Sequence, residues 1–191
     1  MEIRTIAVIG AGGIGPAVAC AALAAGYRVI LEDVLPERLA AAKVEIQGRL
    51  EGPAGAIGGA KTKERLLAHL STARSVAEAC READLVLEML PEEMEMKIDV
   101  FCILEKFARP GAILATSVAS LSVFEIAAVT TRAERCVGVR FPDGVANGHL
   151  LEIVRGRETS AETVEMCAEV GRRMGKQVVV VGELPAGAGQ R

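Results

Sequence analysis

The sequence predicts an α/β fold: a doubly wound, mostly parallel sheet with helices on both faces. Short apolar runs alternate along the chain with longer helical stretches, which is typical of parallel strands joined by helical crossovers. Most of these runs are apolar at consecutive positions, so we expect the strands to be buried on both faces. With 191 residues, 51% of them hydrophobic, the chain is long enough to bury a substantial core.

The expected strands are seven apolar runs, at residues 3–9, 28–31, 85–87, 112–115, 137–139, 151–154 and 177–181. Seven helices are expected between them, at residues 14–25, 36–50, 63–69, 76–80, 93–107, 123–128 and 161–174. Pro36 stands in a first helical turn, where its missing amide hydrogen costs little. The glycine-rich segment 51–60 is the one obvious insert, and we expect it to be poorly ordered.

Three of the helices carry a start signal of the capping-box type. A Ser or Thr is followed three residues later by a Glu in the pairs Ser75 with Glu78, Ser122 with Glu125 and Thr159 with Glu162. In this motif each side chain accepts a hydrogen bond from a free backbone amide at the helix start. We therefore expect these three helices to begin at these pairs.

Charge and cysteine usage exclude several classes of function. The chain has 22 Lys and Arg against 25 Asp and Glu, a net charge of −3, with the two signs mixed throughout. Because there is no basic stripe, we expect no nucleic acid partner and no anionic membrane partner, and no apolar run approaches the ~20 residues of a membrane span. The five cysteines form no C-x-x-C pair, so no metal site is predicted, and free thiols are expected in a reducing, cytoplasmic compartment.

A glycine-rich turn follows the first expected strand. It reads Gly10-Ala11-Gly12-Gly13-Ile14-Gly15, the G-x-G-x-x-G pattern, and an apolar helix follows. Gly10 permits the tight turn, Gly12 lets the backbone approach a pyrophosphate, and Gly15 lets the helix pack closely on the strand. The amides at the helix start attract the anion, helped by the helix dipole. Together these features predict a dinucleotide-binding Rossmann domain.

An acidic residue ends the second expected strand. Asp33 lies 18 positions after Gly15, close to the ~20 expected for the carboxylate that binds a ribose hydroxyl. Such a carboxylate accepts hydrogen bonds from the free 2′-hydroxyl of NAD and repels the 2′-phosphate of NADP. The predicted cofactor is therefore NAD.

Motifs further along the chain carry a family resemblance. Residues 83–92 read ADLVLEMLPE and are followed by Lys97, and residues 112–122 read AILATSVASLS. Residues 125–130, 152–156 and 159–163 continue the likeness. In these motifs the chain resembles, from end to end, the NAD-binding domain of the 3-hydroxyacyl-CoA dehydrogenases, which are oxidoreductases of fatty acid metabolism.

The resemblance implies roles for several residues. Glu92 and Lys97 match positions that approach the nicotinamide half of the cofactor. The turn from Ser117 to Ser120 matches the segment between nicotinamide and substrate, which adds Ser117 to the expected cofactor contacts. The helix that begins near Pro36, with the insert after it, matches the region that meets the CoA of an acyl-CoA substrate.

The chain departs from the family at the catalytic centre. The family's base is the histidine of an H-F-F-N-P run, and here that position is Arg140, while the glutamate that orients the histidine is retained as Glu152. A guanidinium has no lone pair with which to accept a proton. Ala119 replaces a family serine, and asparagines are replaced by Ser117 and Asp143. We therefore expect catalysis to be impaired or absent.

The C-terminal end differs as well. Residues 1–184 are expected to form the dinucleotide-binding domain, and residues 185–191 resemble the start of the linker to the family's helical C-terminal domain, which closes over substrate and forms the dimer. Without that domain we expect self-association around Leu150 and Val179, or a partner subunit. His149 is close to Glu152 in sequence, but the two are expected to face opposite ways at the start of a strand.

Three functions remain open from the sequence. The first is a dehydrogenase of this family that works with an external C-terminal domain. The second is a non-catalytic NAD(H)-binding sensor or partner subunit. The third is a dehydrogenase of altered specificity, in which Arg140 binds a carboxylate substrate.

Overall fold

The computed structural model describes residues 2–51, 60–146 and 148–183. The expectations for most of the insert, at residues 52–59, and for the linker, at residues 185–191, lie outside the described residues. Within the described part, none of the helices is both long enough and apolar enough to pass through a membrane.

The described residues form eight strands: β1 (Thr5–Ile9), β2 (Arg28–Glu32), β3 (Leu70–Ala73), β4 (Leu85–Glu88), β5 (Ile113–Ser117), β6 (Cys136–Arg140), β7 (Leu150–Arg155) and β8 (Gln177–Gly182). Their α-helices are α1 (Gly15–Ala24), α2 (Pro36–Glu51), α3 (Ala60–Leu67), α4 (Val76–Cys80), α5 (Met94–Phe107), α6 (Val123–Ala127) and α7 (Ala161–Arg173). All seven expected strands and all seven expected helices are confirmed, with ends that differ by at most three residues.

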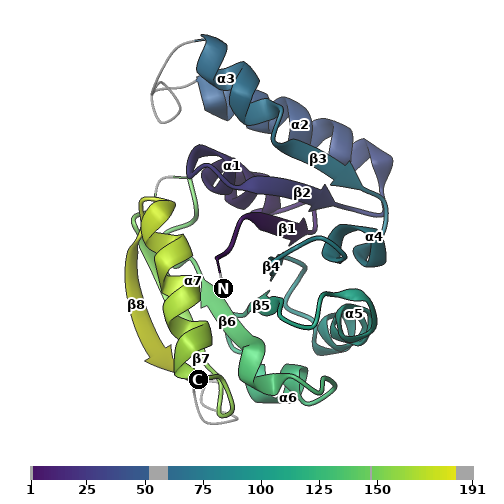
Figure 1. The fold of residues 1–191 in the computed structure, drawn as a ribbon, viewed down its shortest axis with the longest axis vertical. Coiled ribbons are helices and arrows are strands. Elements are labelled where there is room, and N and C mark those ends of the chain that lie inside the picture. Colours follow the sequence, from purple (N-terminus) through teal and green to yellow (C-terminus); the bar gives the residue numbers. More distant parts are fainter. Residues whose placement is uncertain (1, 52–59, 147, 184–191) are drawn as a thin grey trace.

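All eight strands belong to one sheet, in the order β3-β2-β1-β4-β5-β6-β7-β8. Neighbours from β3 through β6 are parallel, whereas β7 runs antiparallel to β6 and parallel to β8. Figure 1 shows β2 and β3 with α2 and α3 at one end of the molecule, and β7 and β8 with α7 at the other. The predicted mostly parallel, doubly wound sheet is confirmed.

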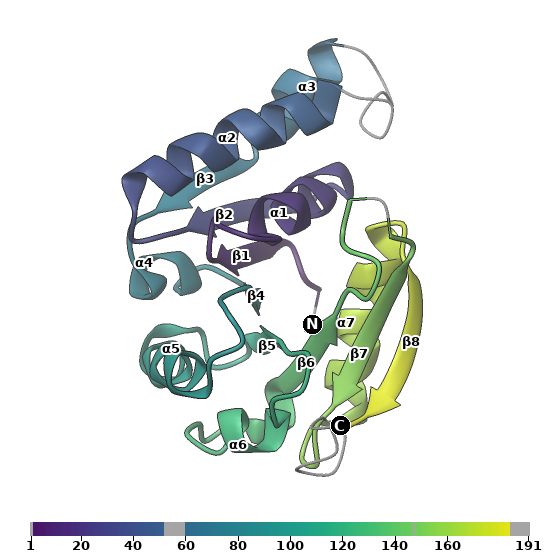
Figure 2. The same cartoon turned by 180° about the vertical axis from the view of Figure 1, so that it is seen from behind.

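Helices cover both faces of the sheet, and each face has its own apolar core. One core contains side chains of α1, α2 and α7, such as Val18, Ile46 and Val170. The other contains side chains of α4, α5 and α6, such as Cys80, Phe101 and Ile126. Figure 2 shows α4, α5 and α6 stacked one below another along the second face. Burial on both faces explains why the strands are apolar at consecutive positions.

Two of the three expected caps are confirmed on their Ser side. Ser75 and Ser122 each accept a hydrogen bond from the amide three residues on, at 3.2 Å. The third prediction was wrong by one residue: Ser160 caps α7, and its hydroxyl accepts from the amide of Thr163. Thr159 instead donates its hydroxyl proton to the carbonyl oxygen of Cys136, so it joins the start of β6 to the loop before α7.

The strand that the sequence did not predict is β3. It contains Ser71 and Thr72, and it lies at an edge of the sheet, where one side pairs with β2 and burial is incomplete. A short edge strand with polar residues has no apolar run to reveal it. Residues 68 and 69, expected as the end of a helix, form the turn that leads into β3.

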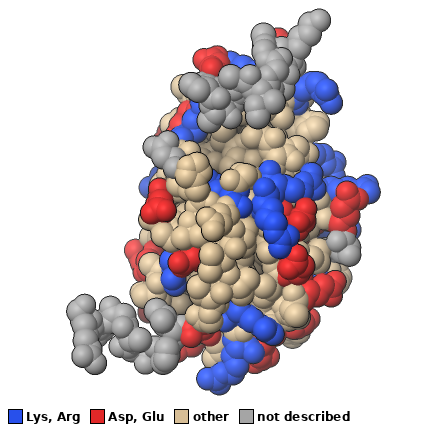
Figure 3. Space-filling view, turned by 90° about the vertical axis from the view of Figure 1, so that its left-hand side faces the viewer, with Lys and Arg blue, Asp and Glu red and all other residues tan. Residues whose placement is uncertain are grey.

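The other edge of the sheet is β8, which exposes apolar side chains. Val179 and Val180 are 41% and 50% exposed. Figure 3 looks onto the side of the molecule that carries β8 and shows a broad area without charged side chains down its middle. An apolar edge strand is a candidate surface for association.

Candidate dinucleotide site and catalytic edge

The site lies at the carboxyl ends of the parallel strands. The strand order reverses at β1, because the chain continues outward to β2 and β3 on one side and to β4 on the other. In open α/β sheets, ligands bind in the crevice outside such a reversal. The residues that follow β1, β2, β4 and β5 are those that the sequence analysis proposed for cofactor binding.

The glycine turn has the geometry that the pattern predicts. Gly10 has φ +102°, a conformation that favours glycine, and its amide donates to the carbonyl of Glu32 at 2.9 Å. A Cβ at Gly15 would collide with the carbonyl oxygen of Gly10, so the start of α1 can approach β1 only with glycine there. A Cβ at Gly12 would meet nothing nearer than 3.8 Å, which leaves the backbone open to a ligand. This turn fits the pyrophosphate of a dinucleotide.

Asp33 stands directly after β2 and faces the glycine turn. Its carboxylate accepts hydrogen bonds from the amides of Ala11 and Leu35, both at 3.0 Å, and the residue is only 5% exposed. The carboxylate therefore joins the end of β2 to the glycine turn. The structure adds a cation that the sequence analysis did not propose: the Nη1 atom of Arg38 lies 3.9 Å from Oδ2 of Asp33.

A second carboxyl group lies beside Asp33. Glu32 is 2% exposed, and its Oε1 atom has no hydrogen-bond partner among the described residues. Burial, followed by the negative charge of Asp33, raises the pKa of Glu32 to about 7. Near neutral pH, Glu32 is therefore divided between its protonated and its ionised form.

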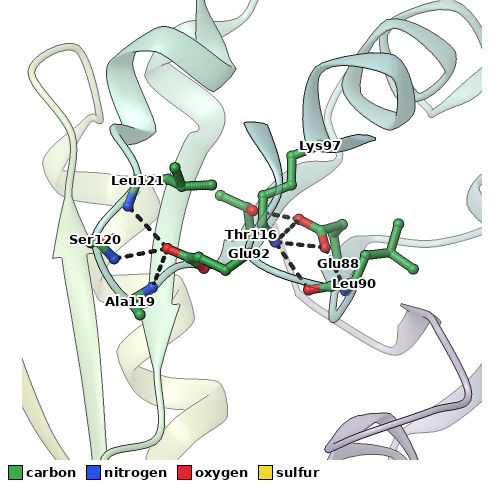
Figure 4. A network of polar contacts seen from close by, with 8 residues as sticks. All are labelled: Glu88, Leu90, Glu92, Lys97, Thr116, Ala119, Ser120 and Leu121. Atoms are coloured by element: carbon green, nitrogen blue, oxygen red, sulfur yellow. Dashed lines mark hydrogen bonds and ion pairs between the residues drawn. The ribbon is translucent and has the colours of Figure 1, made fainter. Parts of the chain in front are cut away.

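Lys97 belongs to a buried network at the ends of β4 and β5. Its ammonium group donates to both carboxylate oxygens of Glu88 at 2.9 Å and to the carbonyl oxygen of Leu90 at 3.3 Å. Thr116 donates to the same carboxylate at 2.5 Å (Figure 4). Lys97 and Glu88 are both fully buried. In this structure Lys97 thus supports the turn after β4, and its charge is compensated by Glu88.

Glu92 links two loops at the carboxyl ends of β4 and β5. Its Oε1 atom accepts hydrogen bonds from three successive amides, those of Ala119 and Ser120 at 2.8 Å and of Leu121 at 3.0 Å (Figure 4). The loop after β4 is thereby fastened to the loop after β5. The sequence analysis assigned Glu92 to the cofactor and did not identify this contact, because nothing local in the sequence pairs the two loops.

Arg140 and Glu152, which the sequence analysis expects at the catalytic centre, form an ion pair. The Nη1 atom of Arg140 donates to Oε2 of Glu152 at 2.8 Å, and its Nε atom donates to the carbonyl oxygen of Val118 at 3.1 Å. The two residues face each other across the antiparallel pair β6 and β7. The side chains of Arg140 and Glu152 are 29% and 21% exposed, so the pair borders the crevice. Arg140 is therefore held in place by Glu152 and by the carbonyl of Val118.

The remaining predicted residues have different surroundings. Ser117 ends β5 and is half-buried, while Ala119 is exposed in the turn that Glu92 holds. Asp143 is exposed in the turn after β6. His149 is exposed directly before β7, and Glu152 pairs with Arg140 on that strand. That His149 and Glu152 face opposite ways stays a prediction.

Two of the buried cysteines are not activated as nucleophiles. All five are free thiols. Burial raises the pKa of Cys136 to about 11 and that of Cys167 to about 12, so both remain protonated at neutral pH.

Comparisons with known proteins agree with the geometry. The chain matches the family described as 3-hydroxyacyl-CoA dehydrogenase, NAD binding domain, over residues 5–184. A probable 3-hydroxybutyryl-CoA dehydrogenase of Bacillus subtilis is 34% identical over 185 residues, which cover 97% of this chain and 64% of that protein. The mitochondrial hydroxyacyl-coenzyme A dehydrogenase of Sus scrofa is 31% identical over 189 residues, which cover 96% of this chain and 60% of that protein.

A solved structure gives the same result. The 3-hydroxybutyryl-CoA dehydrogenase of Escherichia coli K12 superposes with a TM-score of 0.90 at 34% identity, over 97% of this chain and 39% of that one. This chain thus spans less than two thirds of the length of these relatives. It belongs to the 3-hydroxyacyl-CoA dehydrogenase family, it contains that family's NAD-binding domain, and its cofactor is NAD.

Proposed function

We propose that this chain binds NAD(H) as the cofactor domain of a 3-hydroxyacyl-CoA dehydrogenase-like oxidoreductase, and that by itself it does not oxidise 3-hydroxyacyl-CoA. The observation that carries the proposal is the pair of Arg140 and Glu152 at the position of the family's catalytic base. An acyl-CoA is the substrate class that the names of the relatives suggest for the whole protein.

The chemistry needs a base at that position. NAD supplies the hydride acceptor, and the alcohol must lose its proton to a side chain as the hydride leaves. Arg140 has no lone pair for that proton, and two of its donors are already bound to Val118 and Glu152. The pair can hold β6, β7 and the loop after β5 in place, but it cannot perform general base catalysis.

The cofactor side of the site keeps its parts. The glycine turn and Asp33 would hold the pyrophosphate and the adenosine ribose, and Ser117 lies at the end of β5 on the nicotinamide side. Glu92 and Lys97 contribute by fixing the loops after β4 and β5. This contrast between an intact cofactor side and a substituted base favours the second function, an NAD(H)-binding sensor or partner subunit.

The third function receives less support from the geometry. A guanidinium that is to bind a carboxylate substrate needs an uncompensated charge, and the charge of Arg140 is compensated by Glu152 at 2.8 Å. We also propose a cytoplasmic location, since the free thiols suit a reducing compartment.

Titration calorimetry with NADH and restoration of the catalytic residues test the proposal together. The unmodified chain is expected to bind NADH. Arg140→His alone is expected to give no turnover, because Ala119 still lacks the family's hydroxyl, and Ser117 and Asp143 still replace its asparagines. Arg140→His with Ala119→Ser, Ser117→Asn and Asp143→Asn, fused to a relative's C-terminal domain, is expected to form NADH from 3-hydroxybutyryl-CoA. Absence of NADH binding, or full turnover by the single variant, would contradict the proposal.

A further inference from the structure

We propose that Arg38 gives the adenosine end of this site affinity for a 2′-phosphate, so that Asp33 and Arg38 together set the preference between NAD and NADP. This inference rests on the proposed binding of NAD(H), and it concerns the ligand class that the same site accepts. Without Arg38, the carboxylate of Asp33 would exclude NADP by charge repulsion.

The position of Arg38 carries the inference. Arg38 lies in the first turn of α2, and its Nη1 atom is 3.9 Å from the Oδ2 atom of Asp33. The same atom is 3.8 Å from the point where a Cβ at Gly12 would lie. The guanidinium is therefore next to both the ribose-binding carboxylate and the glycine where the backbone is open to the pyrophosphate. A 2′-phosphate on the ribose would enter this neighbourhood.

Among the described residues, only Asp33 lies within ion-pair distance of the Arg38 guanidinium. At 3.9 Å its contact with Asp33 is an ion pair beyond hydrogen-bond distance, so this contact occupies none of its N–H donors. The Arg38 side chain is 57% exposed, whereas the Asp33 side chain is 5% exposed. An exposed guanidinium with free donors binds phosphate through paired, charge-assisted hydrogen bonds.

The charge of Asp33 is partly compensated before any ligand arrives. Its carboxylate accepts two backbone amides and lies within ion-pair distance of Arg38. Glu37, exposed in the same turn of α2, adds one negative charge. The Glu32 carboxyl, which is beside Asp33, is also partly ionised near neutral pH. Because the acidic groups outnumber the single cation, NAD remains the preferred ligand, but with a smaller preference than Asp33 would give without Arg38.

Calorimetry with NAD and NADP on four proteins tests the inference: the unmodified chain, Arg38→Ala, Arg38→Lys and Arg49→Ala. We expect Arg38→Ala to weaken NADP binding by about tenfold or more, the size of a lost charge-assisted hydrogen bond, and NAD binding by less than about threefold. Arg38→Lys is expected to retain part of the NADP affinity. Arg49 lies in the last turn of the same helix and pairs with Glu45, so Arg49→Ala is the matched control. It is expected to leave the affinities for NAD and for NADP unchanged.

A double-mutant cycle extends the test. Asp33→Asn is expected to raise the affinity for NADP relative to that for NAD, and adding Arg38→Ala is expected to remove that gain in affinity. Equal losses for both cofactors in Arg38→Ala would overturn the inference, since Arg38 would then act on a part that the two share. An NADP affinity that Arg38→Ala leaves unchanged would also overturn the inference. The same holds if the unmodified chain binds NAD but binds NADP too weakly to measure. If neither cofactor binds any folded variant, the proposed function fails and this inference fails with it.

Discussion

Two single side chains, Asp33 and Arg140, carry the proposed function of the site at the carboxyl ends of the strands. Asp33 joins β2 to the glycine turn, and Arg140 lies where the proposed dehydrogenase chemistry would need a base. Both were identified in the sequence, because a G-x-G-x-x-G turn and a catalytic motif fix the spacing of the residues around them. Their partners could not be identified in this way. Arg38 reaches the site from the first turn of α2 and Val118 from the loop after β5, and both placements depend on the packed structure.

Glu32 predicts a pH dependence of stability. Its pKa is about 7 in the folded chain, whereas an ordinary glutamate titrates near 4.5. A raised pKa means that the folded state binds the Glu32 proton more tightly than the unfolded state does. Protonated Glu32 therefore contributes fully to the stability of the fold below about pH 4.5, and this contribution is lost as the pH rises through about 7. The difference between the two pKa values corresponds to a change of about 3 kcal/mol in the free energy of unfolding.

Urea unfolding of Glu32→Gln at pH 5 and pH 8 checks this prediction. The variant is expected to be more stable than the unmodified chain at pH 8 and nearly equal to it at pH 5, since its amide stays neutral at both. Glu158→Gln, at an exposed position, is the control and is expected to leave the pH dependence unchanged. If the difference in stability between Glu32→Gln and the unmodified chain is the same at pH 8 as at pH 5, the raised pKa of Glu32 is wrong.

At the scale of elements, the contact of Glu92 with residues 119–121 joins two loops that begin at neighbouring strands. Three amides on one carboxylate oxygen are expected to exchange their hydrogens slowly, although Ala119 and Ser120 are exposed and Leu121 is only half-buried. In Glu92→Ala we expect their exchange to accelerate by about tenfold or more, since each lost bond to a charged acceptor is worth about 1.5–3 kcal/mol. Glu92→Gln, with a neutral acceptor, is expected to be intermediate.

Exchange measured residue by residue with NMR distinguishes this contact from a general loosening. Glu93→Ala is the matched control, because Glu93 precedes α5 and its side chain makes no capping hydrogen bond. If the amides of residues 119–121 exchange equally fast in the unmodified chain and in Glu92→Ala, the carboxylate does not hold this loop.

Two glycines inside helices predict opposite effects of the same substitution. A Cβ at Gly171 in α7 would lie 2.5 Å from Leu151 and 2.9 Å from Val178, so Gly171→Ala is expected to push α7 off β7 and β8 and to cost about 1–3 kcal/mol. A Cβ at Gly48 in α2 would meet nothing within 4 Å, so Gly48→Ala is expected to stabilise by about 0.4–1 kcal/mol. Thermal unfolding of both variants checks the pair, and a stabilising Gly171→Ala would contradict the packing of α7.

The elements themselves were largely predictable, for a physical reason. A strand buried on both faces needs consecutive apolar residues, and such runs mark every strand of the sheet except β3. The run in β8 is the exception to the expected burial, because β8 lies at an edge and is largely exposed. The helix starts were predictable to within a residue. The choice of Ser160 over Thr159 as the cap of α7 was not, because Thr159 is drawn to the carbonyl of Cys136, a contact far away in sequence.

At the scale of the whole molecule, the sheet ends in β8, whose outer edge pairs with no strand among the described residues. With Val179 and Val180 exposed there, we expect self-association that increases with concentration in sedimentation experiments. Val179→Lys is expected to weaken it, because a charged edge opposes strand pairing. Val44→Lys, at a 70% exposed position on α2, is the control and is expected to leave association unchanged. A monomer at all concentrations, or equal effects of the two lysines, would contradict this surface.

We propose that the molecule retains the cofactor half of a dehydrogenase site and has no base at Arg140. The most direct test is NADH formation by the unmodified chain, given NAD and 3-hydroxybutyryl-CoA, against a buffer control. The loss of general base catalysis alone is worth about 10²–10⁴-fold in rate, so we expect no NADH above the control. Steady NADH formation would contradict the account and would indicate a base other than Arg140, with the exposed His149 the first residue to substitute.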